Sequence, residues 1–241
     1  MTGTVLVLGA GAAAGVGGAL VRRFAAGGHH VIAAGRTQEK VDALAEAVRA
    51  DGGSAEGFRV DVTSEAEQDA LFARADALGP IASVIYNAGN NAIIPFESLD
   101  AATLESFWRA GPLGGFLASQ RAMPRMAAAG GGSMLFTGAS ASMRGRPNFA
   151  HFASSKAGLR MLAQALAREY GPKGVHVAHV VVDGVIDGEI VRTRFGEYLD
   201  KLGEDGSLSP DAIAEAFWFL HSQPRSAWTH ELDLRPFCET W

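Results

Sequence analysis

The chain has 241 residues, 48% of them hydrophobic and 20% charged, which is ordinary for a globular protein with a full core. A net charge of −5 without basic runs excludes a nucleic-acid partner, and no apolar run is long enough for a membrane span. One cysteine, Cys238, excludes an internal disulfide, so we expect a cytoplasmic protein with no metal site.

The first stretch, from Thr4 to Phe24, joins a short apolar run, a glycine-rich turn and a helical apolar pattern. Glycines at such a turn let backbone N–H groups approach a diphosphate at the positive end of the new helix. The stretch therefore predicts a dinucleotide-binding turn built on Gly11, Gly15, Val16 and Gly17. The alternative is a small-residue turn that only packs the helix on the strand.

Apolar runs then alternate with segments of helical periodicity. We predict strands at 5–9, 30–35, 58–62, 81–86, 133–137, 176–182 and 228–234. We predict helices at 16–24, 38–50, 65–78, 100–126 with an interruption near 111–115, 149–170, and from 209 onward. This alternation indicates an α/β fold with a doubly wound parallel sheet, a Rossmann fold, in a single domain spanning 1–241.

Ligands of such sheets bind at the carboxyl ends of the strands. The candidate site residues therefore follow the predicted strands: the glycine turn, Arg36, Asp61, 87–89, 137–142 and 183–188. Segment 189–208 lacks a clear periodic pattern beside this edge. We expect either a substrate lid or a surface loop with one helical turn.

Four motifs stand in one order along the chain, namely Gly11-x-x-x-Gly15-Val16-Gly17, Asp61-Val62, Asn87-Ala88-Gly89 and a helix that carries Lys156. In this order they resemble the classical short-chain dehydrogenases/reductases over nearly the whole chain. The resemblance implies that Asp61 hydrogen-bonds the adenine ring, that Asn87 supports the sheet edge beside the cofactor, and that Lys156 holds the nicotinamide ribose. Gly184 keeps the glycine of the family's proline–glycine motif and is counted with the cofactor-binding residues, whereas Asp183 replaces the proline.

The nucleotide type follows from the end of the second strand, where Gly35 precedes Arg36. NAD enzymes place an acidic residue there, and NADP enzymes supply an arginine for the 2′-phosphate. We therefore predict a preference for NADP(H). The alternative is an arginine that only caps a surface helix.

The sequence departs from the family at the positions that carry the family's catalytic residues. The family's tyrosine, four residues before the lysine, is Phe152 here, and its serine, 13 residues further upstream, is Ala139. A one-residue bulge would bring Ser140 into the serine's place, with Ser142 close by. The family's helix asparagine maps onto Gly111. Of the usual catalytic positions only Lys156 is kept.

Two hypotheses remain open. In the first, the protein is an NADP(H)-dependent oxidoreductase for an unknown, partly apolar carbonyl or alcohol substrate, and another group supplies the proton: Lys156, Ser140, Ser142, His151 or Asp187. We expect His151 to face a neighbour or solvent rather than the site. In the second, the protein binds the nucleotide without ordinary redox turnover, as a sensor, a partner subunit, or a lyase or isomerase.

Pocket and interface residues are proposed from their positions alone. The candidate pocket residues are Ile93, Ile94, Pro95, Phe96, Phe152, Val185 and Phe195. Helices around 101–126 and 149–170 are rich in small residues, and the resemblance implies a homodimer or homotetramer. The tail from Trp228, with Phe237, Cys238 and Trp241, is expected to cover a neighbouring subunit or to close the pocket.

Overall fold

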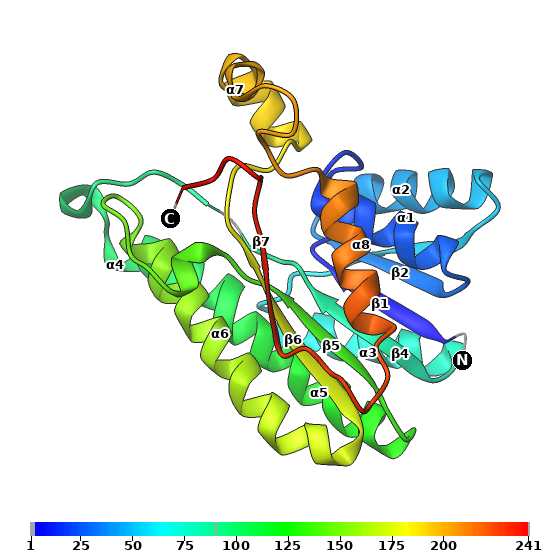
Figure 1. Ribbon diagram of the computed structural model, residues 1–241. Coiled ribbons are helices and arrows are strands. Elements are labelled where there is room, and N and C mark those ends of the chain that lie inside the picture. The colour runs from blue at the N-terminus through cyan, green and yellow to red at the C-terminus, as the bar shows by residue number, and fades with distance from the viewer. Residues whose placement is uncertain (1–2, 90, 241) are drawn as a thin grey trace.

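A parallel sheet of seven strands forms the centre of the computed structural model, which describes residues 3–89 and 91–240 (Figure 1). The strands are β1 (Thr4–Leu8), β2 (His30–Gly35), β3 (Ser54–Arg59), β4 (Ile81–Tyr86), β5 (Gly132–Thr137), β6 (Val175–Val182) and β7 (Glu231–Leu234). Their order is β3-β2-β1-β4-β5-β6-β7, and every pair is parallel. Strands β1 to β3 are added toward one edge of the sheet, and β4 to β7 are added toward the other. The boundary between β1 and β4, where the order of strands reverses, is the usual place for a ligand crevice.

Helices cover both faces of the sheet, so the predicted doubly wound fold is confirmed. One apolar cluster joins the sheet to α1 (Val16–Ala26), α2 (Gln38–Ala50) and α8 (Pro210–His221). A second cluster joins the other face to α3 (Glu65–Leu78), α5 (Gly114–Ala128) and α6 (Ala150–Tyr170), and α4 (Ala101–Trp108) packs on α6. Helix α7 (Glu189–Leu202) projects away from the body of the protein (Figure 1).

Several predicted boundaries are wrong. The third strand spans Ser54–Arg59 rather than 58–62, because it pairs with β2 from His30 onward at the sheet edge, where polar residues are tolerated. The first strand lies one residue earlier than predicted, and the last begins only at Glu231. Segment 189–208, expected to be irregular, is mostly helix α7, kinked at Phe195 (φ −140°, ψ 34°).

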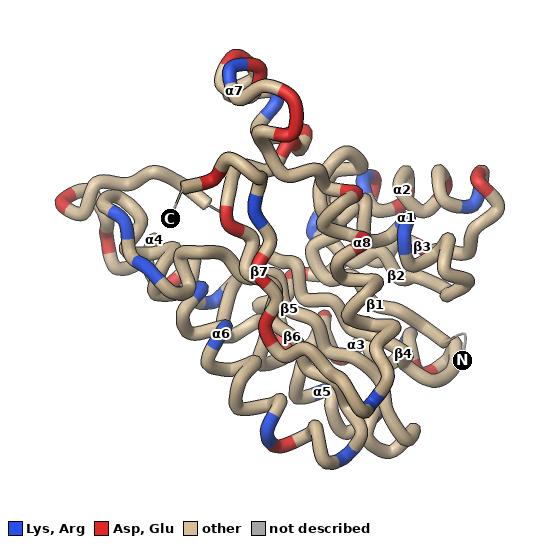
Figure 2. Tube along the Cα trace, viewed as in Figure 1, with Lys and Arg blue, Asp and Glu red and all other residues tan. Residues whose placement is uncertain are grey.

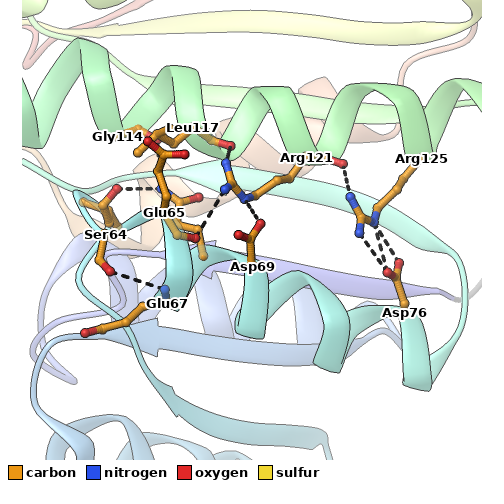
Figure 3. A network of polar contacts seen from close by, with 11 residues as sticks. Ser64, Glu65, Glu67, Asp69, Asp76, Gly114, Leu117, Arg121 and Arg125 are labelled. Carbon is orange, nitrogen blue, oxygen red and sulfur yellow. Dashed lines mark hydrogen bonds and ion pairs between the residues drawn. The ribbon is translucent and has the colours of Figure 1, made fainter.

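Charged side chains fasten α3 to α5 (Figure 3). Arg121 donates to Asp69 at 2.7 Å and to the carbonyl of Glu65 at 3.3 Å, and Arg125 forms a fork with Asp76. Ser64 is the N-cap of α3, since the backbone N–H of Glu67 donates to Ser64 Oγ at 3.3 Å.

The predicted interruption of the long helical region is a π-helical turn, η2 (Arg109–Leu113), between α4 and α5. Pro112 has no N–H to donate within the helix, which favours such a local irregularity. The buried Tyr86 hydroxyl donates to the carbonyl of Ala110 at 2.6 Å and so satisfies a group of this turn. The turn brings Gly111 directly against α6.

Acidic and basic residues are interspersed along the surface rather than gathered by sign (Figure 2). Among the described residues, none of the helices is long and apolar enough to cross a membrane.

Candidate nucleotide-binding and active site

The glycine turn between β1 and α1 has the backbone geometry that only glycine adopts readily. Gly9 and Gly11 have φ values of 92° and 61°. A Cβ added at Gly17 would come within 3.0 Å of the Ala10 carbonyl oxygen, so α1 begins in close contact with the end of β1. None of the described side chains caps the first turn at Gly15, and no acidic residue lies in it. The backbone N–H groups of this turn therefore suit an anion such as a diphosphate.

Asn87 ties together the carboxyl ends of three strands. Its Nδ2 donates to the Gly9 carbonyl at 2.9 Å, and its Oδ1 accepts from Thr137 Oγ1 at 2.8 Å. A Cβ at Gly9 would come 2.6 Å from the backbone nitrogen of Ala88, so the turn after β4 packs directly on the glycine turn. The two motifs thus form one continuous surface.

Lys156 lies on the side of α6 that faces this surface and is only 9% exposed. Its Nζ donates to the Thr137 carbonyl at 2.7 Å, and a Cβ at Gly89 would come 3.5 Å from it. Nζ also lies 5.8 Å from the ring centroid of Phe152. Burial lowers the pKa of Lys156 to about 8. The side chain is therefore a cation that releases its proton more readily than an exposed lysine.

The other end of the candidate site holds Asp61 and Arg36. Asp61 accepts from both the backbone N–H and the hydroxyl of Thr63 at 2.9 Å. These hydrogen bonds, reinforced by the positive charge of Arg36, lower the pKa of Asp61. Arg36 is exposed immediately after β2, and Val62 is buried beside Asp61. The charges here suit the polar adenosine half of a dinucleotide.

The structure gives a physical reason why an asparagine is missing at Gly111. A Cβ at Gly111 would come within 3.0 Å of Ser155 Oγ, which itself donates to the Phe107 carbonyl at 2.8 Å. An asparagine here would therefore force the Ser155 hydroxyl out of its position. The paired part of β5 runs in regular register with β6 up to Thr137. Ala139 follows in extended conformation, at the position 13 residues before Phe152 where the family has its serine.

The alternative proton donors differ in their surroundings. Ser140 is half-buried at the start of a short helical turn, η3 (Ser140–Ser142), whereas Ser142 Oγ is buried without a partner among the described residues. The His151 ring is fully buried, 4.3 Å from the Phe107 ring, with Nε2 3.2 Å from the Ala92 carbonyl oxygen. Asp187 is held as a carboxylate by Arg192, which lowers its pKa. His151 therefore faces a neighbour, as expected.

The sequence did not predict the ionic partners of two acidic side chains, Asp183 and Glu231. Asp183, after β6, is 3% exposed and accepts from Arg144 Nη2 at 2.8 and 3.0 Å. Glu231 of β7 is bound by Arg160 of α6 and by His179 of β6. The two histidines within the apolar run of β6, His176 and His179, were the only sequence signal of a polar group at this place. Beyond the buried site, Ile93, Phe96 and Phe195 are 68%, 74% and 55% exposed.

Residues 4–197 match the family described as short chain dehydrogenase. The oxidoreductase asL5 of Sarocladium schorii is 32% identical over 198 residues, covering 82% of this chain and 78% of that protein. A short-chain dehydrogenase structure from Rhodopseudomonas palustris is similar with a TM-score of 0.83 at 36% identity, covering 98% and 99% of the two chains. A 7α-hydroxysteroid dehydrogenase, solved with NADH and 7-oxo glycochenodeoxycholic acid, gives a TM-score of 0.87 at 27% identity over 96% and 92%.

The chain therefore belongs to the short-chain dehydrogenase family, whose members are oxidoreductases that bind a nicotinamide nucleotide. The residues present fit such a cofactor, because the turn at Gly9 to Gly17 leaves uncapped N–H groups for phosphate and Lys156 is a buried cation with donors to spare.

Proposed function

We propose that the protein is an NADP(H)-dependent oxidoreductase with an atypical active site, acting on a small, partly apolar carbonyl or alcohol substrate. The observation that carries the proposal is the convergence of the glycine turn, Asn87 and Lys156 at one edge of the sheet. The bound nicotinamide supplies the hydride. Gly11, Gly15, Val16 and Gly17 hold the diphosphate, and 61–62, 87–89 and Gly184 line the nucleotide.

Lys156 and Ser140 are the proposed catalytic residues. One donor of Lys156 is used on Thr137, and the ammonium still has donors for the ribose hydroxyls. With its pKa lowered to about 8, the same ammonium keeps its proton at neutral pH and can release it to a developing alkoxide. The Ser140 hydroxyl supplies a second polar contact for the substrate oxygen. Lys156→Ala and Ser140→Ala should each lower turnover of an active substrate, and unchanged turnover in both contradicts these roles.

The preference for NADP(H) rests on Arg36. We expect fluorescence titration to give at least about tenfold tighter binding of NADPH than of NADH, because a guanidinium pairs well with a phosphate dianion. Arg36→Gln should abolish the difference, whereas Arg168→Gln, which removes an exposed arginine on α6, should leave it unchanged. Equal affinity of the wild-type protein for both nucleotides refutes this preference.

A second function, nucleotide binding without redox turnover, is favoured by one specific observation. Phe152, Ala139 and Gly111 all lack the groups that stabilise a developing alkoxide, and Ser155 fills the space at Gly111. Stoichiometric NADPH binding with no oxidation across a broad panel of ketones and aldehydes would support a sensor, a partner subunit, or a lyase or isomerase.

The remaining assignments concern surroundings of the site. We propose a cytoplasmic homodimer or homotetramer, supported by Trp108, Phe116 and Met161, which are 49%, 44% and 50% exposed on α4, α5 and α6. We propose α7 as a substrate lid and the tail at Phe237, which is 83% exposed, as a cover for the pocket or for a neighbouring subunit. Trp241 lies outside the described residues.

A further inference from the structure

Three side chains from three elements form a polar group between α6 and the sheet, which we call the His179 cluster, with a buried histidine and a half-buried ion pair. It consists of His179 on β6, Glu231 on β7 and Arg160 on α6. Arg160 donates to both carboxylate oxygens of Glu231, at 2.6 and 2.7 Å. His179 has no exposed surface. Arg160 follows Lys156 by one helical turn, so the cluster and the lysine share one side of α6.

The hydrogen bonds fix the tautomer of His179. Its Nδ1 lies 3.1 Å from Glu231 Oε2, and because a carboxylate only accepts, Nδ1 carries the proton. Burial lowers the pKa of His179 to about 4 and outweighs the attraction of Glu231, whose charge Arg160 already balances. The ring is therefore neutral, and Nε2 presents a lone pair that can only accept.

That lone pair is buried and has no partner among the described residues. Nε2 packs against Gly138, where an added Cβ would come within 3.0 Å of it. Gly138 directly follows Thr137, whose carbonyl is the only described acceptor of the Lys156 ammonium. An unsatisfied buried acceptor and a buried cation with two unused donors thus lie beside two consecutive residues, Gly138 and Thr137, at the carboxyl end of β5. Buried polar groups of this kind are normally satisfied directly or by an enclosed water.

We propose that His179 is a positioning residue for Lys156, whose ammonium donates to Nε2 through one buried water and is thereby supported in its charged form. Of the charged groups on the elements packed here, Arg160 of α6 is paired with Glu231 of β7, and Asp183 at the end of β6 is paired with Arg144. Because the carboxylates are paired with arginines, the neutral acceptor is the group that favours the charged lysine. The inference deepens the role of Lys156 in the proposed function.

The test is a pH titration of the lysine Cε signals by ¹³C NMR, on the whole protein without nucleotide. The chain has four lysines, Lys40, Lys156, Lys173 and Lys201, of which Lys156 alone is buried, and Lys156→Arg assigns its signal. We expect His179→Leu to lower the pKa of Lys156 by about one pH unit, a tenfold loss of proton affinity. His179→Gln keeps an acceptor oxygen and should stay closer to the wild type.

The matched control is His176→Leu, which removes a buried histidine of the same strand whose side chain points to the opposite face. It should leave the Lys156 titration unchanged. A Lys156 pKa that stays the same or rises in His179→Leu overturns the proposal. If His179→Leu does not fold, His179→Phe replaces it: the ring keeps a similar shape but offers no nitrogen acceptor, so the Lys156 pKa should fall, and an unchanged value overturns the proposal equally.

An NADPH titration on the same samples separates the two proposals. A Lys156 pKa that depends on His179 in a protein that does not bind NADPH keeps this inference and removes the proposed function. NADPH binding together with a Lys156 pKa that His179→Leu leaves unchanged keeps the proposed function and removes this inference.

Discussion

Lys156 shows how two opposing local effects set the charge of one residue. The Phe152 ring, with its centroid 5.8 Å from Nζ, attracts the ammonium through its π face. Removal from water disfavours the same charge, and this effect is larger because the pKa falls to about 8. A tyrosine at 152 would add an ionisable hydroxyl near this cation. Phe152 offers no such hydroxyl, so the charge of Lys156 is set by the ring and by burial alone.

We predict that Phe152→Tyr raises NADPH-dependent reduction of simple ketones by about 10²-fold, the low end for general acid catalysis. The gain stays low because Ala139 and Gly111 still offer no polar group. NADPH oxidation followed at 340 nm across a ketone panel measures it. In Phe152→Tyr combined with Lys156→Met the gain should vanish. A double variant as active as the single one would show that the hydroxyl acts without the lysine.

At the scale of elements, the packing of α1 on β1 determines where the candidate phosphate site forms. The helix starts so close to the strand that a Cβ at Gly17 would meet the Ala10 carbonyl within 3.0 Å. Both partners are backbone, so neither yields as a flexible side chain would. The register of β1 with β4 then sets Asn87 beside the same turn.

Gly17→Ala should lower the free energy of unfolding by about 1–3 kcal/mol and weaken NADPH binding, because the added methyl forces α1 away from β1. Gly196→Ala is the matched control: it also lies in a helix, α7, but an added Cβ meets nothing within 4 Å. The control should be neutral or stabilising by up to about 1 kcal/mol. Urea unfolding measures both, and equal effects would contradict the close-packing argument.

Across the whole molecule, buried histidines make stability depend on pH. Burial lowers the pKa of His179 and of His221 to about 4, and for His221 the charges of His29 and His176 add to the effect. Since the unfolded pKa is near 6.5, the unfolded chain binds more protons at mildly acidic pH. The stability contributed by these neutral rings is complete above pH 6.5 and is lost as pH falls toward 4.

We predict that the free energy of unfolding falls by about 2 kcal/mol between pH 7 and pH 5 on account of His179 alone, at about 1.4 kcal/mol per pH unit. Urea denaturation at several pH values measures it. The carboxyl groups contribute little in this window, because their unfolded pKa values lie below it. His179→Gln should reduce the slope, and a stability independent of pH from 7 to 5 would contradict the burial argument.

The exposed aromatic and methionine side chains on α4 to α6 predict that whole chains associate into an oligomer. Size-exclusion chromatography with light scattering should give a mass of two or four chains. Trp108→Glu should shift that mass toward the monomer, because it places a charge on an apolar face. A monomeric wild-type protein would refute the oligomer.

The sequence was sufficient to predict the fold class and the edge of the sheet where ligands bind, because periodicity and glycine turns are local signals. The third strand was misplaced because β3 is an edge strand, and of the run at 58–62 only Phe58 and Arg59 belong to the paired segment. The rest of the run leads into α3. Helix α7 was missed because only Leu199 in it is buried, so it lacks an apolar face.

The candidate site was only partly predictable for a different reason. Lys156 and Asn87 stand in local motifs, and their positions could be read from the chain. The His179 cluster joins residues 52 and 71 positions apart in sequence, Glu231 with His179 and with Arg160. Such pairings depend on strand order and register, which no local pattern encodes. Likewise, the absence of an asparagine at position 111 is explained only by the position of Ser155 in the fold.

Helix α7 begins on the glycine turn, where the backbone N–H of Glu189 donates to the Ala14 carbonyl at 3.3 Å, and then leaves the body of the protein. With Leu199 as its single buried residue and a kink at Phe195, it should open locally at small cost and become the first target of a protease. Brief trypsin treatment should cut at Arg192, Arg194 or Lys201 before any other site, as mass spectrometry of the fragments can show. Because the glycine turn supports the start of α7, NADPH should slow this cleavage, so a digest on a gel reports nucleotide occupancy without any substrate being known.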